Sequence, residues 1–217
     1  SARYRKNIIL DHISASWSVD ETMSIYHCEN ITIQWCMITE SLSQSNHTKG
    51  SHGFGGIWGS NYSTYHHNLL AHHSNRTPRL CGSRYSDRAD MEKVDLCNNV
   101  IYNWSSEGAY GAQGGSYNIM NNYYKPGPVA VPKKVHCRFF TAYVDDGANN
   151  QAAGIYGKFY LSGNFMDTRS DLSKSQLAEV EAANADNTSS TAFVVKNNEM
   201  SAQDMLVAQR FDILSDY

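Results

Sequence analysis

Two basic and two acidic residues could meet on one surface of this chain. Arg76 and Arg79 are three residues apart, and Asp20 is followed directly by Glu21. Guanidinium groups bind carboxylates through paired hydrogen bonds, whereas carboxylates can hold Ca²⁺ through their oxygens. Lys49, in a long glycine-containing loop, could add a third cation. These residues predict a site for an anionic ligand, with calcium as a candidate partner.

A repeated strand pattern would have to position these groups. Short apolar runs recur along the chain, at Asn7–Ser14, Asn30–Thr39, Tyr65–His72, Val94–Tyr102, Tyr117–Tyr124 and Lys158–Met166. Aligned on Ile13, Met37, Leu69, Val100, Tyr123 and Phe165, the runs are 24, 32, 31, 23 and 42 residues apart. The shorter intervals match one coil of a parallel β-helix, and the longer ones match a coil with an inserted loop. The sequence therefore predicts an all-β solenoid.

Asparagine recurs at one position of this repeat. Asn68, Asn99, Asn122 and Asn164 each immediately precede an aligned residue. Stacked coils would place these amides about 4.8 Å apart, where they could hydrogen-bond along the axis as a ladder. The alternative is that asparagine is simply common at turns. Four recurrences in one register favour the ladder.

The same register predicts which side chains share a face. Asp20 lies seven residues after Ile13, and Arg76 lies seven residues after Leu69. Both are therefore expected on one side of the solenoid, two coils or roughly 10 Å apart. The equivalent positions in the other coils are Gln44 and Glu107.

The chain divides into two parts by pattern. Residues 1–169 carry the coils and their inserted loops, and residues 170–217 form a tail expected to pack on or cap the solenoid. Helices are predicted at Ser170–Asn184 and at Ser201–Leu214, with Ser201 as N-cap. Lys125–Lys134 holds three of the four prolines and is expected to be an irregular loop. Because a strand pattern begins at Asn7, we expect further N-terminal coils to be missing.

Composition limits the classes of binding partner that are expected. The net charge of −3 offers no general attraction for nucleic acid or for an anionic membrane, and no apolar run is long enough to span a bilayer. We therefore expect neither partner, and a monomer. The five cysteines do not have metal-site spacing. They are expected to be buried thiols, although one disulfide stays possible.

Several segments together resemble a known family. Asn7–His12 resembles a strand that ends in Asp-His, Trp17–Glu21 resembles a calcium-binding carboxylate region, and Ser74–Arg79 is similar to an Arg-x-Pro-Arg segment. Asn121–Tyr124 matches an Asn-Asn-Tyr-Tyr coil. In this order they resemble polysaccharide lyase family 1, the pectate and pectin lyases. The resemblance implies a right-handed, single-stranded parallel β-helix that is secreted or periplasmic.

The resemblance also implies roles for particular residues. Arg76 would be the catalytic base, while Arg79 and Lys49 would bind substrate. Asp20 matches the first carboxylate of the family's Asp-x-x-x-Asp calcium pair, but the second position is Ser24. Glu21 would compensate for the missing ligand, with Glu40 as an alternative.

The function implied is that of a pectate lyase, which cleaves (1→4)-α-D-galacturonan by β-elimination and leaves 4,5-unsaturated oligogalacturonates. An arginine base requires nearby positive charge that favours its neutral form. Without the resemblance, Arg76 would be interpreted only as a carboxylate binder. Two alternatives stay open: a non-catalytic pectin-binding β-helix and a calcium-independent pectin lyase. A β-helical hydrolase is less favoured, because no pair of aspartates shares the register.

Overall fold

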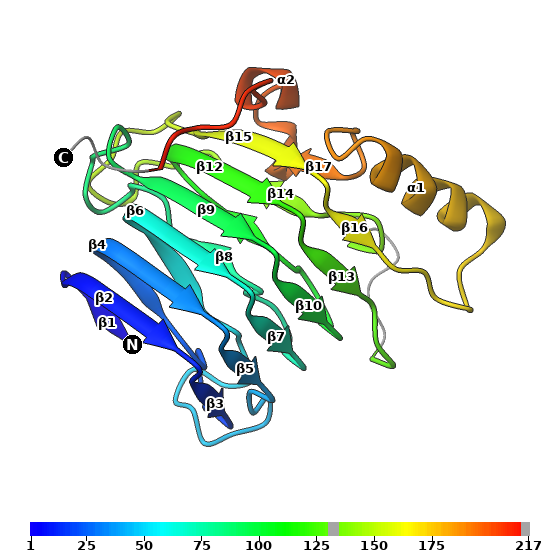
Figure 1. The fold of residues 1–217 in the computed structure, drawn as a ribbon, viewed down its shortest axis with the longest axis horizontal. Helices are drawn as coiled ribbons and strands as arrows, with labels where there is room; N and C mark the ends of the chain where they lie inside the picture. Colours follow the sequence, from blue (N-terminus) through cyan, green and yellow to red (C-terminus); the bar gives the residue numbers. More distant parts are fainter. Residues whose placement is uncertain (130–134, 214–217) are drawn as a thin grey trace.

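The computed structural model describes residues 1–129 and 135–213 and has the expected architecture, a parallel β-helix (Figure 1). Successive coils stack so that equivalent strands pair in parallel. One face comprises β2 (Lys6–Asp11), β4 (Ile25–Gln34), β6 (Ile57–His66), β9 (Lys93–Cys97), β12 (Gly115–Met120) and β15 (Gly157–Ser162). A second face comprises β3 (Ser14–Ser16), β5 (Met37–Thr39), β7 (Leu69–Ala71), β10 (Val100–Tyr102), β13 (Tyr123–Lys125) and β16 (Phe165–Met166).

A third face carries Arg79, one of the candidate site's basic residues. It comprises β1 (Ala2–Arg3), β8 (Arg79–Leu80), β11 (Tyr110–Gly111), β14 (Phe140–Ala142) and β17 (Phe193–Val195). The ten-residue strands β4 and β6 turn the corner between faces. Their first residues pair with β1 and β8, whereas their later residues belong to the first face.

The strand register matches the sequence alignment except in the first coil. Met37, Leu69, Val100, Tyr123 and Phe165 are successive partners, as predicted. The partner of Met37 in the first coil is Ser14 rather than Ile13, so that part of the alignment was wrong by one residue. The reason is that Ile13 follows a left-handed residue, His12, and occupies the turn position that asparagine holds in later coils.

The asparagine ladder is present and buried. Nδ2 of each residue donates to Oδ1 of the next at 3.0–3.1 Å, through Asn68, Asn99, Asn122 and Asn164. The same Oδ1 atoms accept backbone N–H groups from the preceding coil. The ladder continues to Asn187, which the repeat analysis did not include. These amides satisfy polar groups that would otherwise be buried without partners at every turn.

The interior of the solenoid is apolar and rich in aromatic rings. Trp58, Tyr65, Tyr117, Phe159 and Phe193 are among the largest fully buried side chains. Stacking continues on the outside, where Tyr123 and Phe165 are parallel with ring centroids 6.0 Å apart. All five cysteines are free thiols and four are buried, as expected.

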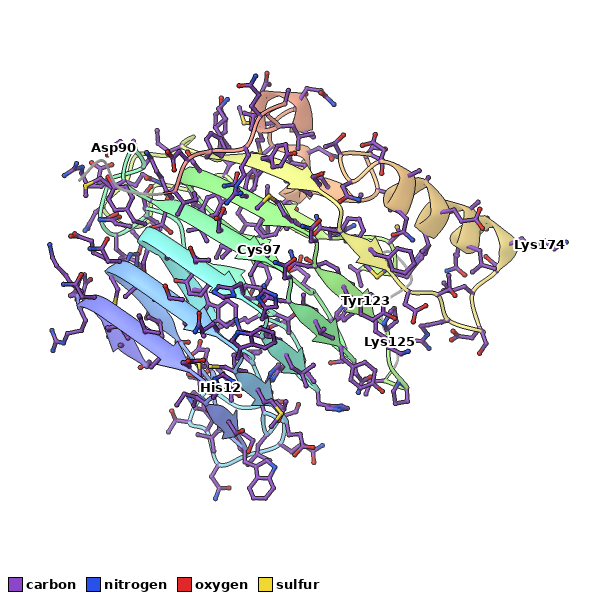
Figure 2. The ribbon with its side chains drawn as sticks, in the orientation of Figure 1. His12, Asp90, Cys97, Tyr123, Lys125 and Lys174 are labelled. Atoms are coloured by element: carbon purple, nitrogen blue, oxygen red, sulfur yellow. The ribbon has the colours of Figure 1, made fainter. Side chains whose placement is uncertain are left out.

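Exposed side chains on the strands also form hydrogen bonds and ion pairs. Figure 2 labels Tyr123 and Lys125, which both project outward from β13. The hydroxyl of Tyr123 donates to Asp167 at 2.7 Å, and Lys125 Nζ lies 3.3 Å from the same carboxylate.

Beyond β13 the predicted loop Lys125–Lys134 has no strand at residues 126–129, and its residues 130–134 lie outside the described part.

The tail packs against the last coils. Helix α1 (Lys174–Ala185) has a capping box between Ser173 and Gln176, contacts β16, and begins four residues later than predicted. Ser201 caps α2 (Ala202–Met205) as predicted. That helix is shorter than expected, because Val207 leaves it to hydrogen-bond the carbonyl of Phe159.

A short 3₁₀ turn, η2 (Lys196–Asn198), joins β17 to this last segment. Lys174 points away from the coils at the start of α1 (Figure 2). Within the described residues, no helix is both long and apolar enough to cross a membrane.

Replacing one ladder residue should destabilise the fold sharply. In Asn122→Ala, the amide that bonds Asn164 and the carbonyl of Leu96 is lost, and Asn99 loses its acceptor. Buried groups left without partners cost about 1–3 kcal/mol each. We expect the free energy of unfolding to fall by at least about 2 kcal/mol in urea titrations followed by circular dichroism. Ser162→Ala, an exposed position in a neighbouring coil, is the control and should change little; equal stability of both variants would contradict the ladder's role.

Candidate active site

Three neighbouring coils bring the candidate residues together. Glu21 pairs with Phe54, and Phe54 pairs with Asn75, as isolated parallel bridges. The backbone N–H of Gly55 donates to Asn75 O at 3.0 Å, and that of Gly56 donates to Arg76 O at 2.9 Å. Through these bridges Glu21 is in register with Asn75, the residue before Arg76. Asp20 therefore does not share the register position of Arg76 that the sequence predicted.

Arg76 is held between an acid and a ring. Its guanidinium forms an ion pair with Glu21 and lies over the ring of Phe54, with Cζ 4.1 Å from the centroid. Only about a fifth of either charged side chain is exposed, 19% for Arg76 and 18% for Glu21. The residue has a left-handed backbone, with φ of 57°. Nε of Arg76 is buried and has no hydrogen-bond partner among the described residues.

A second and a third arginine lie beyond Arg76. Arg79, on β8, approaches the ring of Tyr110, with Cζ 5.7 Å from the centroid. Arg84 lies over Tyr85 at 4.8 Å. Burial is the main cause that lowers the pKa of Arg84 below its usual value, and the positive charge of Arg79 lowers it further. The Nε atoms of Arg79 and Arg84, like that of Arg76, are buried without a hydrogen-bond partner in the described part of the chain.

Asp20 faces two imidazoles instead of joining Glu21. Its Oδ2 lies 3.6 Å from Nε2 of His47, and its Oδ1 lies 3.8 Å from Nε2 of His52. Both histidines belong to the loop between β5 and β6. Lys49 lies in the same loop with an exposed side chain, and its backbone N–H donates to Nδ1 of His47 at 3.2 Å.

The other acidic and polar candidates have different partners. Glu107 accepts a hydrogen bond from the hydroxyl of Tyr143 at 2.9 Å. Glu40 accepts one from the indole of Trp17 at 3.0 Å. Gln44 is exposed in the loop between β5 and β6. The carboxylate opposite Arg76 is therefore Glu21.

The donors around Asp20 and Glu21 do not fit a protein-built calcium site. Calcium takes six to eight oxygen ligands, whereas Asp20 is surrounded by imidazole nitrogens and Glu21 is engaged by Arg76. Ser24, at the second family carboxylate position, is buried and accepts the backbone N–H of Ile57. No step of the chemistry below is therefore assigned to calcium.

Sequence reasoning did not identify Phe54, His47 or His52 as site residues. The available signal was the glycine run around Phe54. A Cβ on Gly55 would collide with the carbonyl oxygen of Arg76, and one on Gly56 would collide with that of Met23. Glycines at these positions let neighbouring coils approach closely, which places Phe54 directly beside Arg76.

Curated relatives match most of the chain. A protein named "Probable pectate lyase C" from Aspergillus terreus is 32% identical over 183 residues, covering 76% of this chain and 39% of the relative. Its namesake from Aspergillus fumigatus is 34% identical over 170 residues, covering 76% of this chain and 33% of the relative. An Aspergillus flavus protein of the same name is 33% identical over 129 residues, covering 57% of this chain and 27% of the relative.

Fold and site together define a parallel β-helix with a cluster of arginines on one coil. The relatives confirm the resemblance to the pectate and pectin lyases of polysaccharide lyase family 1. No family model matches the chain. The chain spans between 27% and 39% of the length of the three relatives described.

His73 beneath the site should make stability depend on pH. Its ring nitrogens contact Ser41 Oγ at 2.7 Å and the carbonyl of Ile38 at 2.8 Å, so its role is structural. Burial lowers the pKa of His73 from 6.5 to about 4. Between these values the unfolded chain binds the proton and the folded chain does not, so stability is complete above pH 6.5 and is lost as the pH falls towards 4.

The contribution of His73 reaches about 1.4 kcal/mol per pH unit. Burial also lowers the pKa of His27 from 6.5 to about 4, so urea titrations from pH 4 to pH 7 should show the contributions of both histidines. His73→Gln should reduce the slope by the share of His73, whatever its absolute stability. An unchanged slope in the variant would show that His73 is not the titrating group.

Proposed function

We propose that this protein is a pectate lyase-like polysaccharide lyase that acts on galacturonan. The observation that carries the proposal is the clustering of Arg76, Arg79 and Arg84 between β7 and β9 of one coil, where each Nε–H has no hydrogen-bond partner among the described residues. Guanidinium donors prefer carboxylates, and galacturonan offers one carboxylate on every sugar. The names of the relatives support the same substrate class.

The chemistry follows from the placement of the arginines. Arg79 would bind and neutralise the carboxylate at C-5 of one sugar, which makes the C-5 proton more acidic. A guanidine nitrogen of Arg76 would take that proton. The electron pair of the C–H bond then forms the C-4–C-5 double bond, the C-4–O bond breaks, and the departing oxygen is protonated by solvent. A rigid coil supports this step because it fixes the base relative to the bound sugar.

Glu21 holds the guanidinium of Arg76 in an ion pair. Substrate carboxylates also compete with Glu21 for the same guanidinium. Exchange of Glu21 for substrate would therefore precede proton transfer.

Two other functions have specific support. A non-catalytic pectin-binding β-helix is favoured by the Arg76–Glu21 ion pair, which suits binding better than base catalysis. A calcium-independent pectin lyase is favoured by the imidazole surroundings of Asp20. Calcium itself stays a prediction of the resemblance, as do a secreted or periplasmic location and a monomeric state.

Removing the proposed base should greatly slow the formation of unsaturated products. Arg76→Ala should lower the rate of ultraviolet absorbance increase on polygalacturonate by about 10²–10⁴-fold, the usual contribution of a general base. Arg88→Ala is the matched control, since Arg88 is exposed and forms an ion pair with nearby Asp90. Full activity of Arg76→Ala would exclude the base. Oligogalacturonate binding by the unmutated protein without any unsaturated product would favour the non-catalytic pectin-binding β-helix.

The need for calcium can be measured in the same assay. Asp20 and Glu21 do not form a common set of oxygen ligands for calcium. We therefore expect activity on polygalacturonate to survive the calcium-selective chelator EGTA. Complete loss with EGTA and recovery with added Ca²⁺ would contradict this and restore calcium as the cofactor. Comparing pectin of high and low methyl esterification then separates pectin lyase from pectate lyase.

Freeing Arg76 from Glu21 should strengthen substrate binding. Glu21→Gln removes the internal anion that competes with substrate carboxylates for this guanidinium. Partly exposed ion pairs are worth up to about 1 kcal/mol, so KM for polygalacturonate should fall roughly three- to fivefold. An increase in KM would mean that Glu21 contacts the substrate or holds Arg76 in its binding position.

A further inference from the structure

We propose that Asp20, His47 and His52 form a binding site for a divalent transition-metal ion of the zinc class. One donor atom from each residue lies within 4.8 Å of the other two. Two imidazoles and one carboxylate are a donor set preferred by zinc and similar ions, and they are poorly suited to calcium. The two histidine side chains are largely buried, at 17% and 14% exposure, and Asp20 is 38% exposed.

The tautomer of His52 leaves a place for a cation. Nδ1 of His52 lies 3.0 Å from the carbonyl oxygen of Gly50, which can only accept, so Nδ1 carries the proton in the neutral ring. Nε2 then directs a lone pair towards Oδ1 of Asp20, 3.8 Å away. That carboxylate oxygen is buried and has no hydrogen-bond partner among the described residues. Two acceptors facing one another require a positive species between them.

His47 needs one local change. Its Nδ1 accepts the backbone N–H of Lys49 at 3.2 Å, which places the neutral proton on Nε2, facing Asp20. Metal binding through Nε2 moves this proton to Nδ1 and releases the Lys49 N–H, which lies in an exposed loop. At His52, the carbonyl of Gly50 already accepts a hydrogen bond from Nδ1. Such a hydrogen bond to the second ring nitrogen commonly orients a metal-binding imidazole.

The observed separations are close to those that a metal requires. Tetrahedral zinc with ligands at about 2.0–2.2 Å places its donor atoms roughly 3.3–3.5 Å apart. The Asp20 oxygens are 3.6 and 3.8 Å from the two Nε2 atoms, and the imidazole centroids are 4.1 Å apart. Each carboxylate–imidazole separation needs to shorten by a few tenths of an ångström, and the two imidazole donors lie within 4.8 Å of one another. Three protein ligands leave a fourth position for water or an anion.

The backbone fixes this arrangement beside Arg76. Phe54 N–H donates to the carbonyl of Asp20 at 3.1 Å, which anchors the far end of the loop to the carboxylate's own coil. The ring of His52 lies 4.8 Å from that of Phe54, on which Arg76 is stacked. A bound ion would therefore hold the loop between β5 and β6 against the coil that carries Glu21.

The proposal is tested by metal binding to the full chain without any pectin, so that it stands or falls separately from the lyase function. After removal of metals with a chelator, calorimetric titration with Zn²⁺ should show tight binding, and Co²⁺ should give a visible absorption band from nitrogen ligation. Asp20→Asn and His52→Ala should each weaken the Zn²⁺ affinity by more than about 100-fold, since even outer partners of metal ligands contribute 10–100-fold.

A second cluster in the described residues, His136, Cys137 and Glu179, provides the matched control. Cys137→Ser should leave the tight Zn²⁺ binding and the Co²⁺ band unchanged. His47→Gln is a conservative second ligand variant, and circular dichroism without metal verifies that each variant is folded. Zn²⁺ affinity that survives both Asp20→Asn and His52→Ala, or that is lost in Cys137→Ser, would overturn the site; so would the absence of tight binding by the unmutated chain.

Discussion

Stacking of parallel coils in one register is the constraint on which this molecule depends. Each turn of the solenoid would bury backbone groups, and the ladder from Asn68 to Asn187 satisfies them by repeating one amide geometry along the axis. Because each amide both donates to the next coil and accepts from the previous one, a slip of one residue would break every rung. The ladder therefore fixes which side chains meet on neighbouring coils.

The candidate site is a direct consequence of that register. Glu21, Phe54 and Asn75 become neighbours although they are far apart in sequence, and Arg76 is stacked on the ring between them. The close approach relies on glycine, since side chains at Gly55 and Gly56 would strike the adjacent backbone. Positive charge accumulates after β7, where Arg76, Arg79 and Arg84 each have a buried Nε without a partner among the described residues. A polymer carrying regularly spaced carboxylates is a natural complement to a regularly spaced solenoid.

The sequence predicted the repeated part of the fold well, because asparagine and apolar residues recur at fixed offsets within each coil. It erred where the repeat is not explicit. Ile13 stands at a ladder position without asparagine, so the first coil was displaced by one residue. The loops that follow each coil differ in length, and Glu21 rather than Asp20 pairs with Arg76. Asn187 was missed because the helix α1 intervenes before it. The fold of the loop between β5 and β6 places His47 and His52 beside Asp20, and the repeat register does not predict that contact.

The central claim is that galacturonan binds on the coils that carry Phe54 and Arg76. Titrating isotope-labelled protein with trigalacturonate and following nuclear magnetic resonance spectra tests this directly. The account predicts that the largest shifts fall on the Nε–H signals of Arg76 and Arg79 and on the amides of Phe54 and Asn75. Shifts concentrated instead on the exposed rings of Trp35 and His67, stacked 4.4 Å apart on the other side of the coil corner, with the arginine signals unmoved, would contradict it.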